Sequence, residues 1–294
     1  MACGPAARDD LRGQPLPDAQ TVVPGNARTC QKVDFVFIVD DSGSMGQEQT
    51  ALGQAFPQFA TILENYQVSG GGKLDYRVAI TTTGRTVHYR VQPPLPGLPA
   101  VAMNEAGDDG RFRATCNLPR RWLTREDPNV ATALSCRANV GTSGPSFEMP
   151  FMTTMLALSA RLQDTNAGFL RDDALLGVIV LTDEDDCSRR DDNFTISEGD
   201  DGCAVAPAEM VGFLDQLKGG RGRWTAAVVA GPTTCESTYG SALAAPRLQQ
   251  FVSLANAGAT QNAVFASICE ANIAGALQRA LDTFAAACDN FPIE

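Results

Sequence analysis

Along this chain, segments with the apolar pattern of a strand alternate with segments that have the apolar pattern of a helix. Residues 33–39 form an almost continuous run of β-branched and aromatic side chains, which is typical of a strand buried on both faces. Residues 47–67 carry apolar side chains three and four positions apart, and this spacing predicts a helix. Pro57 lies inside that segment, so we expect it to bend the helix or to end its first half.

The alternation continues towards the carboxyl end. Further strands are expected at residues 74–82, 174–181, 224–230 and 263–268. Amphipathic helices are expected after residue 150 and at residues 208–217, 247–257 and 273–284. Strands that alternate with helices predict an α/β fold with a doubly wound parallel sheet and helices on both faces.

Two segments interrupt this regular pattern. Residues 85–140 are rich in proline and contain a Gly-Asp-Asp-Gly stretch, which indicates an insertion made largely of loop. A loop of that length without its own core is unusual, and a local disulfide would order it. Residues 188–204 form a second, acidic insertion.

The turn after the first strand carries the residues with the clearest chemistry. Asp40, Ser42 and Ser44 place one carboxylate and two hydroxyls at alternate positions. These hard oxygen donors suit Mg²⁺, Ca²⁺ or Mn²⁺ rather than Zn²⁺. The strand at residues 174–181 ends in a second acidic turn, 183–186, whose carboxylates repel one another unless a cation or water screens them. A divalent cation is therefore expected at this edge of the sheet.

The spacing Asp40-x-Ser42-x-Ser44, behind a buried strand and before a helix, resembles the metal-ion-dependent adhesion site of von Willebrand factor type A domains. The resemblance covers about residues 31–288. It implies a Rossmann-like, mostly parallel sheet of six strands, with a short antiparallel edge strand within residues 120–124. It also implies that Mg²⁺ or Ca²⁺, with Mn²⁺ as an alternative, is held by Asp40, Ser42, Ser44 and Asp183.

A third loop of the family supplies a threonine ligand just before a helix, and here the sequence departs from the pattern. Glu148 occupies roughly the threonine position, with Thr142 and Ser146 as hydroxyl alternatives. Alternatively, the Glu148 carboxylate could have no ligand role and interact favourably with the positive end of the helix dipole. The family's Thr-Asp-Gly turn is matched by Asp183, but Glu184 replaces the glycine. A ligating Glu148 would tighten metal binding and make the site less attractive to an acidic partner.

What the resemblance implies about function is a binding module and not an enzyme. In the family, the open coordination position takes an oxygen, often a carboxylate, from a partner protein, and this contact anchors the interface. One alternative is a structural envelope lipoprotein whose metal only orders the loops. A metal-dependent hydrolase is the least supported, because the sequence has no Gly-x-Ser-x-Gly elbow and no candidate histidine base.

The charge and the cysteine content of the chain limit its possible partners, its possible metal sites and its cellular location. A net charge of −11 argues against nucleic acid as a partner. Nine cysteines without a Cys-x-x-Cys pair, and the single histidine His88, exclude a Cys/His zinc set and indicate disulfides of an exported protein. Eight cysteines permit roughly a hundred pairings. From their order along the chain we expect Cys30–Cys288, Cys116–Cys136, Cys187–Cys203 and Cys235–Cys269.

Residues 1–29 have no apolar period, which predicts a flexible leader. We expect a domain at residues 30–288 and a short tail at residues 289–294 to follow it. The ninth cysteine is Cys3, in Met1-Ala2-Cys3-Gly4. This start resembles a mature bacterial lipoprotein whose signal peptide was replaced by Met-Ala, although an accidental cysteine in a disordered tail is the alternative. We therefore expect a lipid-anchored domain of the bacterial outer membrane, cell surface or periplasm, attached to the membrane through its anchor only.

Overall fold

The computed structural model describes residues 30–291, apart from short gaps at 69–70, 96, 115, 117, 198–201, 238–239, 259–260 and 271–272. The leader with Cys3 and residues 292–294 of the expected tail lie outside the described residues. Among the described helices, none has both the length and the apolarity that crossing a bilayer would require.

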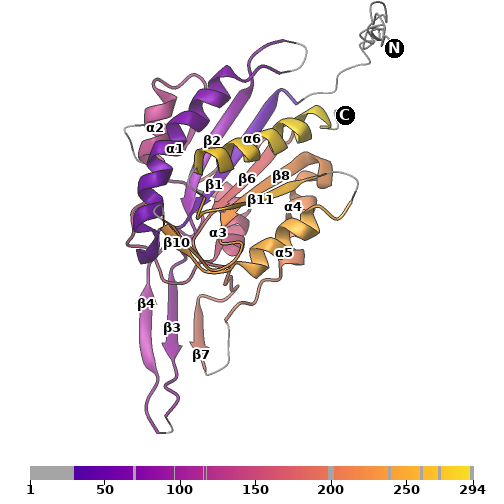
Figure 1. Ribbon diagram of the computed structural model, residues 1–294. Helices are drawn as coiled ribbons and strands as arrows, with labels where there is room; N and C mark the ends of the chain where they lie inside the picture. The colour runs from indigo at the N-terminus through magenta and orange to yellow at the C-terminus, as the bar shows by residue number, and fades with distance from the viewer. Residues whose placement is uncertain are drawn as a thin grey trace, which may run out of the picture.

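A six-stranded sheet with the order β11-β8-β6-β1-β2-β5 forms the centre of the molecule (Figure 1). Its strands are β1 (Lys32–Val39), β2 (Asp75–Thr82), β5 (Trp122–Thr124), β6 (Leu175–Leu181), β8 (Trp224–Ala230) and β11 (Ala263–Ser267). Four of the pairings are parallel, whereas β5 runs antiparallel to β2. The sheet is therefore mixed, and the expectation of a mostly parallel sheet is corrected at this edge. The short antiparallel edge strand that the resemblance implied is present.

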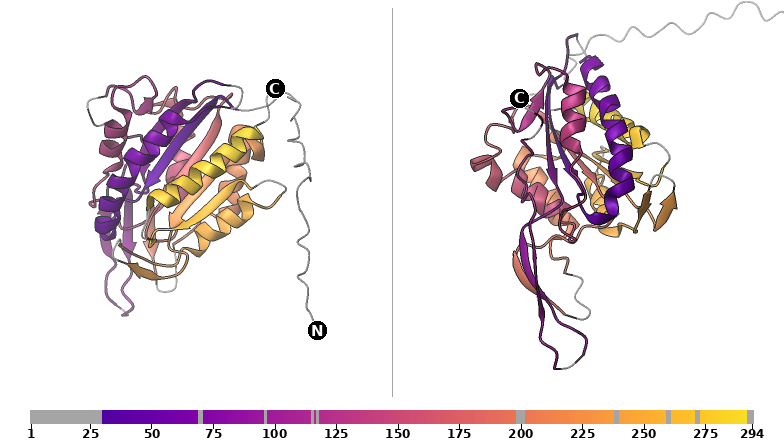
Figure 2. Two further views of the ribbon diagram at one scale, coloured as in Figure 1. Left: turned by 45° about the horizontal axis from the view of Figure 1, so that its top comes forward. Right: turned by 90° about the vertical axis from the view of Figure 1, so that its left-hand side faces the viewer.

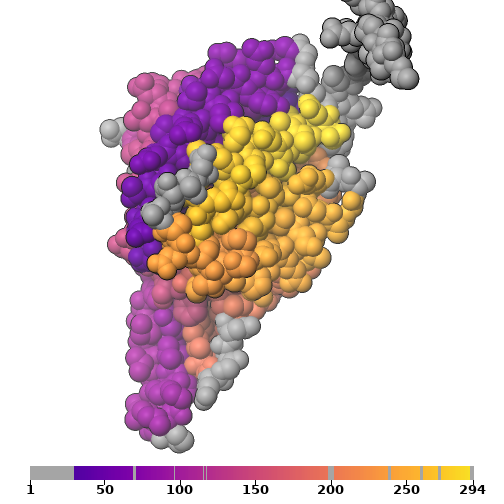
Figure 3. Space-filling model, in the orientation of Figure 1, coloured from indigo at the N-terminus to yellow at the C-terminus, as the bar shows by residue number. Residues whose placement is uncertain are grey.

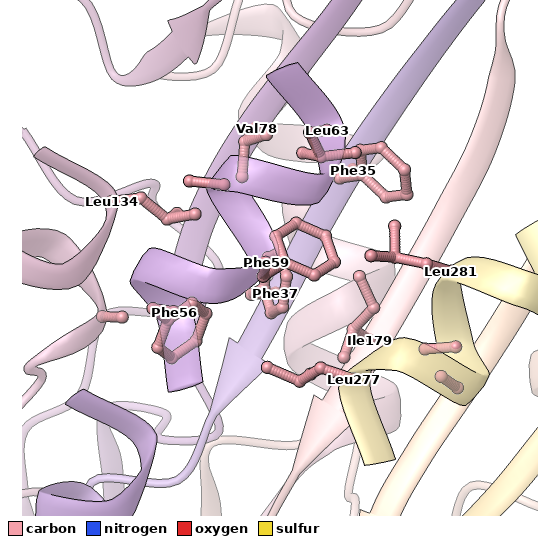
Figure 4. Packing of buried hydrophobic residues seen from close by; sticks show 14 of the residues in the cluster. Phe35, Phe37, Phe56, Phe59, Leu63, Val78, Leu134, Ile179, Leu277 and Leu281 are labelled. Atoms are coloured by element: carbon pink, nitrogen blue, oxygen red, sulfur yellow. The ribbon is translucent and has the colours of Figure 1, made fainter. Parts of the chain in front are cut away.

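Helices cover both faces of this sheet because its central strands are apolar on both sides. One face packs against α1 (Gly46–Asn65), α2 (Val130–Ala138) and α6 (Ile273–Asp289). The other packs against α3 (Pro150–Ala157), α4 (Pro207–Lys218) and α5 (Pro246–Ala255). Figure 4 shows Phe37 of β1 against Phe56 and Phe59 of α1, with ring centroids 5.2 and 5.1 Å apart. This packing fixes the carboxyl end of β1 from both sides.

Helix α1 continues through Pro57, so the expectation that this proline ends the first half of the helix is wrong. A proline has no N–H to donate to the carbonyl four residues earlier, which here belongs to Gly53. The Ser135 hydroxyl of α2 donates to that carbonyl instead, at 3.1 Å. The neighbouring helix thus replaces the missing hydrogen bond.

The first insertion, expected to be made largely of loop, also contains short strands, and two of them combine with a strand of the second insertion into a second sheet. Strands β3 (Val87–Val91) and β4 (Val101–Glu105) form an antiparallel hairpin, and β7 (Asn193–Ile196) from the second insertion pairs parallel to β3. These three strands, in the order β4-β3-β7, are called the arm. The arm projects from the end of the main sheet at which β1 and β2 finish (Figures 1 and 2) and forms a narrow lobe on the surface (Figure 3).

All four expected disulfides are present, which confirms the pairing proposed from the order of the cysteines. The Cα separations are 4.9 Å for Cys30–Cys288, 6.1 Å for Cys116–Cys136, 4.2 Å for Cys187–Cys203 and 6.3 Å for Cys235–Cys269. Cys235, expected in a loop, instead begins β9 (Cys235–Ser237), which pairs with β10 (Gly240–Ala242). Its disulfide ties this small hairpin to the segment that follows β11.

Candidate metal centre

Asp40 follows the last residue of β1 and its side chain is fully buried. One carboxylate oxygen accepts a hydrogen bond from the Thr182 hydroxyl at 2.6 Å, and the other accepts one from the Ser42 backbone N–H at 2.8 Å. These bonds hold the carboxylate between the ends of β1 and β6. Burial raises the pKa of Asp40, and the nearby charge of Glu184 acts in the same direction.

The two serines of the motif lie together beside this carboxylate. The Oγ atoms of Ser42 and Ser44 are 3.0 Å apart. Ser42 is buried, whereas Ser44 is exposed, so the pair leads from the interior to the surface. The short 3₁₀ turn Gly43–Met45 joins the motif to α1 and sets this arrangement.

Asp183 comes from the turn after β6 and completes the group that the sequence predicted from two loops. Its carboxylate accepts a hydrogen bond from the Ser44 side chain, while its Oδ1 is buried without a hydrogen-bond partner. Burial and the charge of Asp40 are the main causes that raise the pKa of Asp183 to about 7. A buried carboxylate oxygen that lacks a partner is unfavourable unless something else, such as a cation, contacts it.

Of the three candidates for the third loop, the structure places Glu148 closest to the group. Burial and the charges of Asp40 and Glu184 raise the pKa of Glu148 to about 10, and a hydrogen bond to the Glu184 side chain adds to this shift. Ser146 is directed elsewhere, since its hydroxyl donates to Glu105 of the arm at 2.6 Å. Thr142 is exposed and lines a separate groove between α1 and α2.

Negative charges dominate the electrostatics of this group. No basic side chain is among the main influences on the pKa of Asp40, Glu148 or Asp183. Across the described residues, no three Asp, Glu, His or Cys side chains by themselves form a cluster with metal-binding geometry. A cation at this position would therefore depend on the serine hydroxyls as well as on the carboxylates. Hydroxyl and carboxylate oxygens form a donor set that fits Mg²⁺ or Ca²⁺.

The group opens into a surface depression of about 580 Å³. Ser44, Asp183 and Glu184 line one side of it, and the β9–β10 hairpin lines the other. Leu243, which follows this hairpin, donates its backbone N–H to the Asp183 carbonyl at 2.8 Å and leaves its side chain 55% exposed. A ligand that reached Ser44 from outside would therefore pass an apolar side chain on the rim.

Three residues that contribute here were not predicted as part of the site. Thr182 orients Asp40, Glu184 adds charge beside Glu148, and Glu48 of α1 accepts the Ser241 backbone N–H at 2.9 Å and so holds the hairpin. Thr182 and Glu184 are neighbours of Asp183, so their positions in the acidic turn were a usable signal. Glu48 offered none, because an acidic residue in the first turn of a helix is expected from the helix dipole alone.

No protein-family model and no curated protein sequence matches this chain. Among solved structures, proximal thread matrix protein 1 of the mussel byssus has a TM-score of 0.44 at 13% identity, with 88% of this chain and 49% of that chain covered. Manganese-loaded TRAP protein of Plasmodium vivax has a TM-score of 0.41 at 11% identity, covering 88% and 74%. The Streptococcus pneumoniae pilus adhesin RrgA has a TM-score of 0.30 at 14% identity, covering 53% and 21%.

This chain spans about half the length of the byssus protein, one structure of which has a zinc-occupied MIDAS motif. Likenesses at these scores carry no argument about the present chain. Its proposed function therefore rests on its own residues.

Proposed function

We propose that this chain is a divalent-cation-dependent protein-binding module, of the adhesion type, and not an enzyme. The observation that supports it is the meeting of Asp40, Asp183 and Glu148 with two serine hydroxyls, without a basic residue to balance their charge. A divalent cation would supply that balance and would contact the unpartnered Oδ1 of Asp183. Asp40, Ser42, Ser44, Asp183 and Glu148 are the residues that would hold it.

The cation we propose is Mg²⁺ or Ca²⁺, with Mn²⁺ as the alternative, because hydroxyl and carboxylate oxygens suit all three ions. The 3.0 Å between the two serine hydroxyl oxygens is a hydrogen-bond distance and does not select among them.

The partner we propose is a protein that offers an acidic side chain. Its carboxylate would enter the depression past the exposed Leu243 and meet the cation beside Ser44. A metal–carboxylate contact of this kind acts as a central anchor when the surrounding surface excludes water.

One observation favours a second candidate, a structural metal. Glu148 adds a further carboxylate beside Asp40, where the resembling family has a neutral threonine. If Glu148 occupies the position that a partner would use, the cation would order the loops without binding a protein. The two functions make different predictions for metal-dependent capture of a partner.

We further propose that the protein works outside the cytoplasm. The four disulfides support this location, because such bonds persist in oxidising compartments. Attachment to a bacterial envelope through a lipid on Cys3 is part of the same proposal.

Calorimetry with MgCl₂, MnCl₂ and CaCl₂ tests the cation site. Asp40→Ala and Ser44→Ala should lose binding, while Ser241→Ala, which alters a serine in the same depression, should bind as the natural protein does. Circular dichroism checks that each variant is folded. Unchanged Mg²⁺ affinity in both Asp40→Ala and Ser44→Ala would remove the site. Capture of envelope or extracellular proteins that requires Mg²⁺ and Ser44 would support the binding module over the structural metal.

A further inference from the structure

The arm is apolar on one face and polar on the other. Paired residues of neighbouring strands lie on the same face, and the register joins Tyr89 to Met103 and to Phe194. The face so defined carries Val87, Tyr89, Val91, Val101, Met103, Phe194 and Ile196, and beside the buried Val87 it also carries Glu105. The opposite face carries His88, Arg90, Ala102, Asn104, Asn193 and Thr195.

Only the base of the apolar face is covered by the rest of the molecule. Phe147, Met149 and Met152 pack against it beside the loop that carries Glu148, with Tyr89 and Phe147 ring centroids 5.0 Å apart. Towards the tip the face is open, where Val101 is 54% exposed and Met103 39% exposed. Of the six large apolar side chains that are exposed among the described residues, five lie on the arm or its tip: Val91, Leu95, Leu98, Val101 and Met103.

Strand β4 is an open edge of the arm, since β3 is its only neighbour among the described strands. The backbone N–H groups of His88 and Gln92 donate to carbonyls of the β7 segment, so residues 88, 90 and 92 direct their backbone groups away from β4. Tyr89 and Val91 therefore bond to β4 through their partners Met103 and Val101. It follows that Ala102 and Asn104 direct their N–H and C=O groups to the open edge.

Residues 101–104 of β4 carry nothing that discourages the addition of another strand, and the acidic Glu105 at the end of β4 is bonded to Tyr89 and Ser146. Exposed edges are usually protected by Lys, Pro or a bulge, and residues 101–104 are Val-Ala-Met-Asn. Residues 87–104 contain no Asp or Glu, although the chain has 34 acidic residues. Arg90 lies opposite the small Ala102 and forms no ion pair with any residue that the structure describes. Its side chain is long enough to reach over Ala102 towards an added strand.

We propose that β4 is a docking edge for an extended segment of a partner protein, which joins the arm as a fourth strand and alternates apolar with acidic residues. Its apolar side chains would extend the face formed by Val101 and Met103. Its acidic side chains would lie on the face that carries Arg90. A second copy of this chain is a poorer occupant, because two molecules with a net charge of −11 repel each other. This inference goes beyond the proposed cation site and does not depend on it.

The test pans a display library of random linear peptides on the folded protein in EDTA. Enriched peptides are then synthesised and titrated by fluorescence anisotropy. We expect sequences in which apolar and acidic residues alternate, and equal binding to the natural protein and to Asp40→Ala. That equality separates this proposal from the cation site.

Ala102→Pro is the decisive variant, because it removes an outward N–H without removing a β3–β4 hydrogen bond. It should weaken binding by about tenfold or more. Ala102→Ser keeps the N–H and should bind normally, and Arg90→Gln should weaken acidic peptides alone. Should Ala102→Pro fail to fold by circular dichroism, Asn104→Pro makes the same test, since the Asn104 N–H also faces outward.

The proposal is overturned if no peptide is enriched, or if enriched peptides bind Ala102→Pro as tightly as Ala102→Ser. It is also overturned if the protein alone forms a dimer in sedimentation that Ala102→Pro abolishes, because the edge would then belong to a second copy.

Discussion

Several buried carboxylates in this protein differ in whether an arginine pairs with them. Asp34, fully buried in β1, forms an ion pair with Arg171 at 2.8 Å, and Asp186 lies 3.4 Å from Arg247. Asp40, Asp183 and Glu148 have no comparable arginine, although each is also buried. Since a buried charge normally requires a partner, the contrast within one molecule points to a missing cation at this place.

Glu148 allows a prediction at the scale of a single residue. Glu148→Gln keeps the shape of the protonated acid but needs no proton from solution, so at neutral pH the metal-free variant should unfold at a higher temperature than the natural protein. If Glu148 is a ligand, its loss should weaken Mg²⁺ binding by about 10-fold to 100-fold, measured by calorimetry. Glu148→Thr, which restores the family's residue type, should recover part of that affinity. Mg²⁺ binding equal to that of the natural protein in both variants would exclude Glu148 from the ligands.

At the scale of elements, neighbouring segments supply what individual segments lack. Helix α1 contains a proline that leaves the Gly53 carbonyl without a helical donor, and α2 supplies one from Ser135. The arm takes two strands from one insertion and one from the other, and neither insertion contains the complete sheet. Two contacts hold the loop with Glu148 against the arm. Phe147 packs on Tyr89, and the Ser146 hydroxyl donates a hydrogen bond to Glu105.

The contact between the two helices can be tested by a double-mutant cycle. Ser135→Ala should lower the free energy of unfolding by about 1 kcal/mol, because the partly buried Gly53 carbonyl loses its donor. In a Pro57→Ala background the same change should cost clearly less, since the N–H of an alanine at position 57 can bond to that carbonyl. Urea unfolding measures all four proteins. Equal costs in the two backgrounds would mean that the Ser135 hydroxyl does not replace the helical donor.

At the scale of the whole molecule, disulfides close the domain and its stability should depend on the cation. Cys30 precedes β1 and Cys288 lies in the last turns of α6, so their bond joins the two ends of the described domain. A bond across 258 positions constrains the unfolded chain strongly. At the carboxyl ends of β1 and β6, by contrast, repulsion between like charges opposes folding.

Those charges predict how stability changes with pH. Without metal, the pKa of Asp183 is raised to about 7 and that of Glu148 to about 10. The folded state then binds more protons than the unfolded state above pH about 4, so the free energy of unfolding should fall as the pH rises from about 5 to about 8. A cation binds the ionised carboxylates, so its stabilising effect should grow over the same range.

Thermal unfolding in EDTA and in excess MgCl₂ measures this effect. The difference between the two unfolding temperatures should widen with pH in the natural protein and should be absent in Asp40→Ala. A difference that is the same at every pH would contradict the proposed role of these carboxylates.

The proposed membrane anchor makes a separate prediction for the full-length gene with its native start. Cys3 takes no part in the four disulfides, and it stands in Ala-Cys-Gly. In cell fractionation the natural protein should sediment with membranes, whereas Cys3→Ser should be released, because a lipid on this residue would be the only attachment. The tether is excluded if mass spectrometry finds Cys3 unmodified or if Cys3→Ser stays in the membrane fraction.

The local pattern of apolar and polar residues was sufficient to predict the main strands and helices and part of the candidate site. The five parallel strands and most helices follow from apolar periods, since burial on one or both faces repeats every two or 3.6 residues. The family resemblance implied that Asp40, Ser42, Ser44 and Asp183 meet, and the two oxygen-rich turns after parallel strands predicted a cation at this edge of the sheet. The sequence alone could not decide among the possible disulfide pairings, and the fold confirms the one that was proposed.

Tertiary structure alone decided the features that depend on distant partners. The proline in α1 is tolerated because Ser135, which lies 82 positions after Gly53, donates to the Gly53 carbonyl. Strands β3, β4 and β7 are short, and they are strands because they pair with one another across the two insertions. Glu148 and Ser146 are two positions apart in one loop, yet the fold directs one to Asp40 and the other to Glu105. Periodicity reports only which side chains are buried, whereas contacts between distant segments decide what they are buried against.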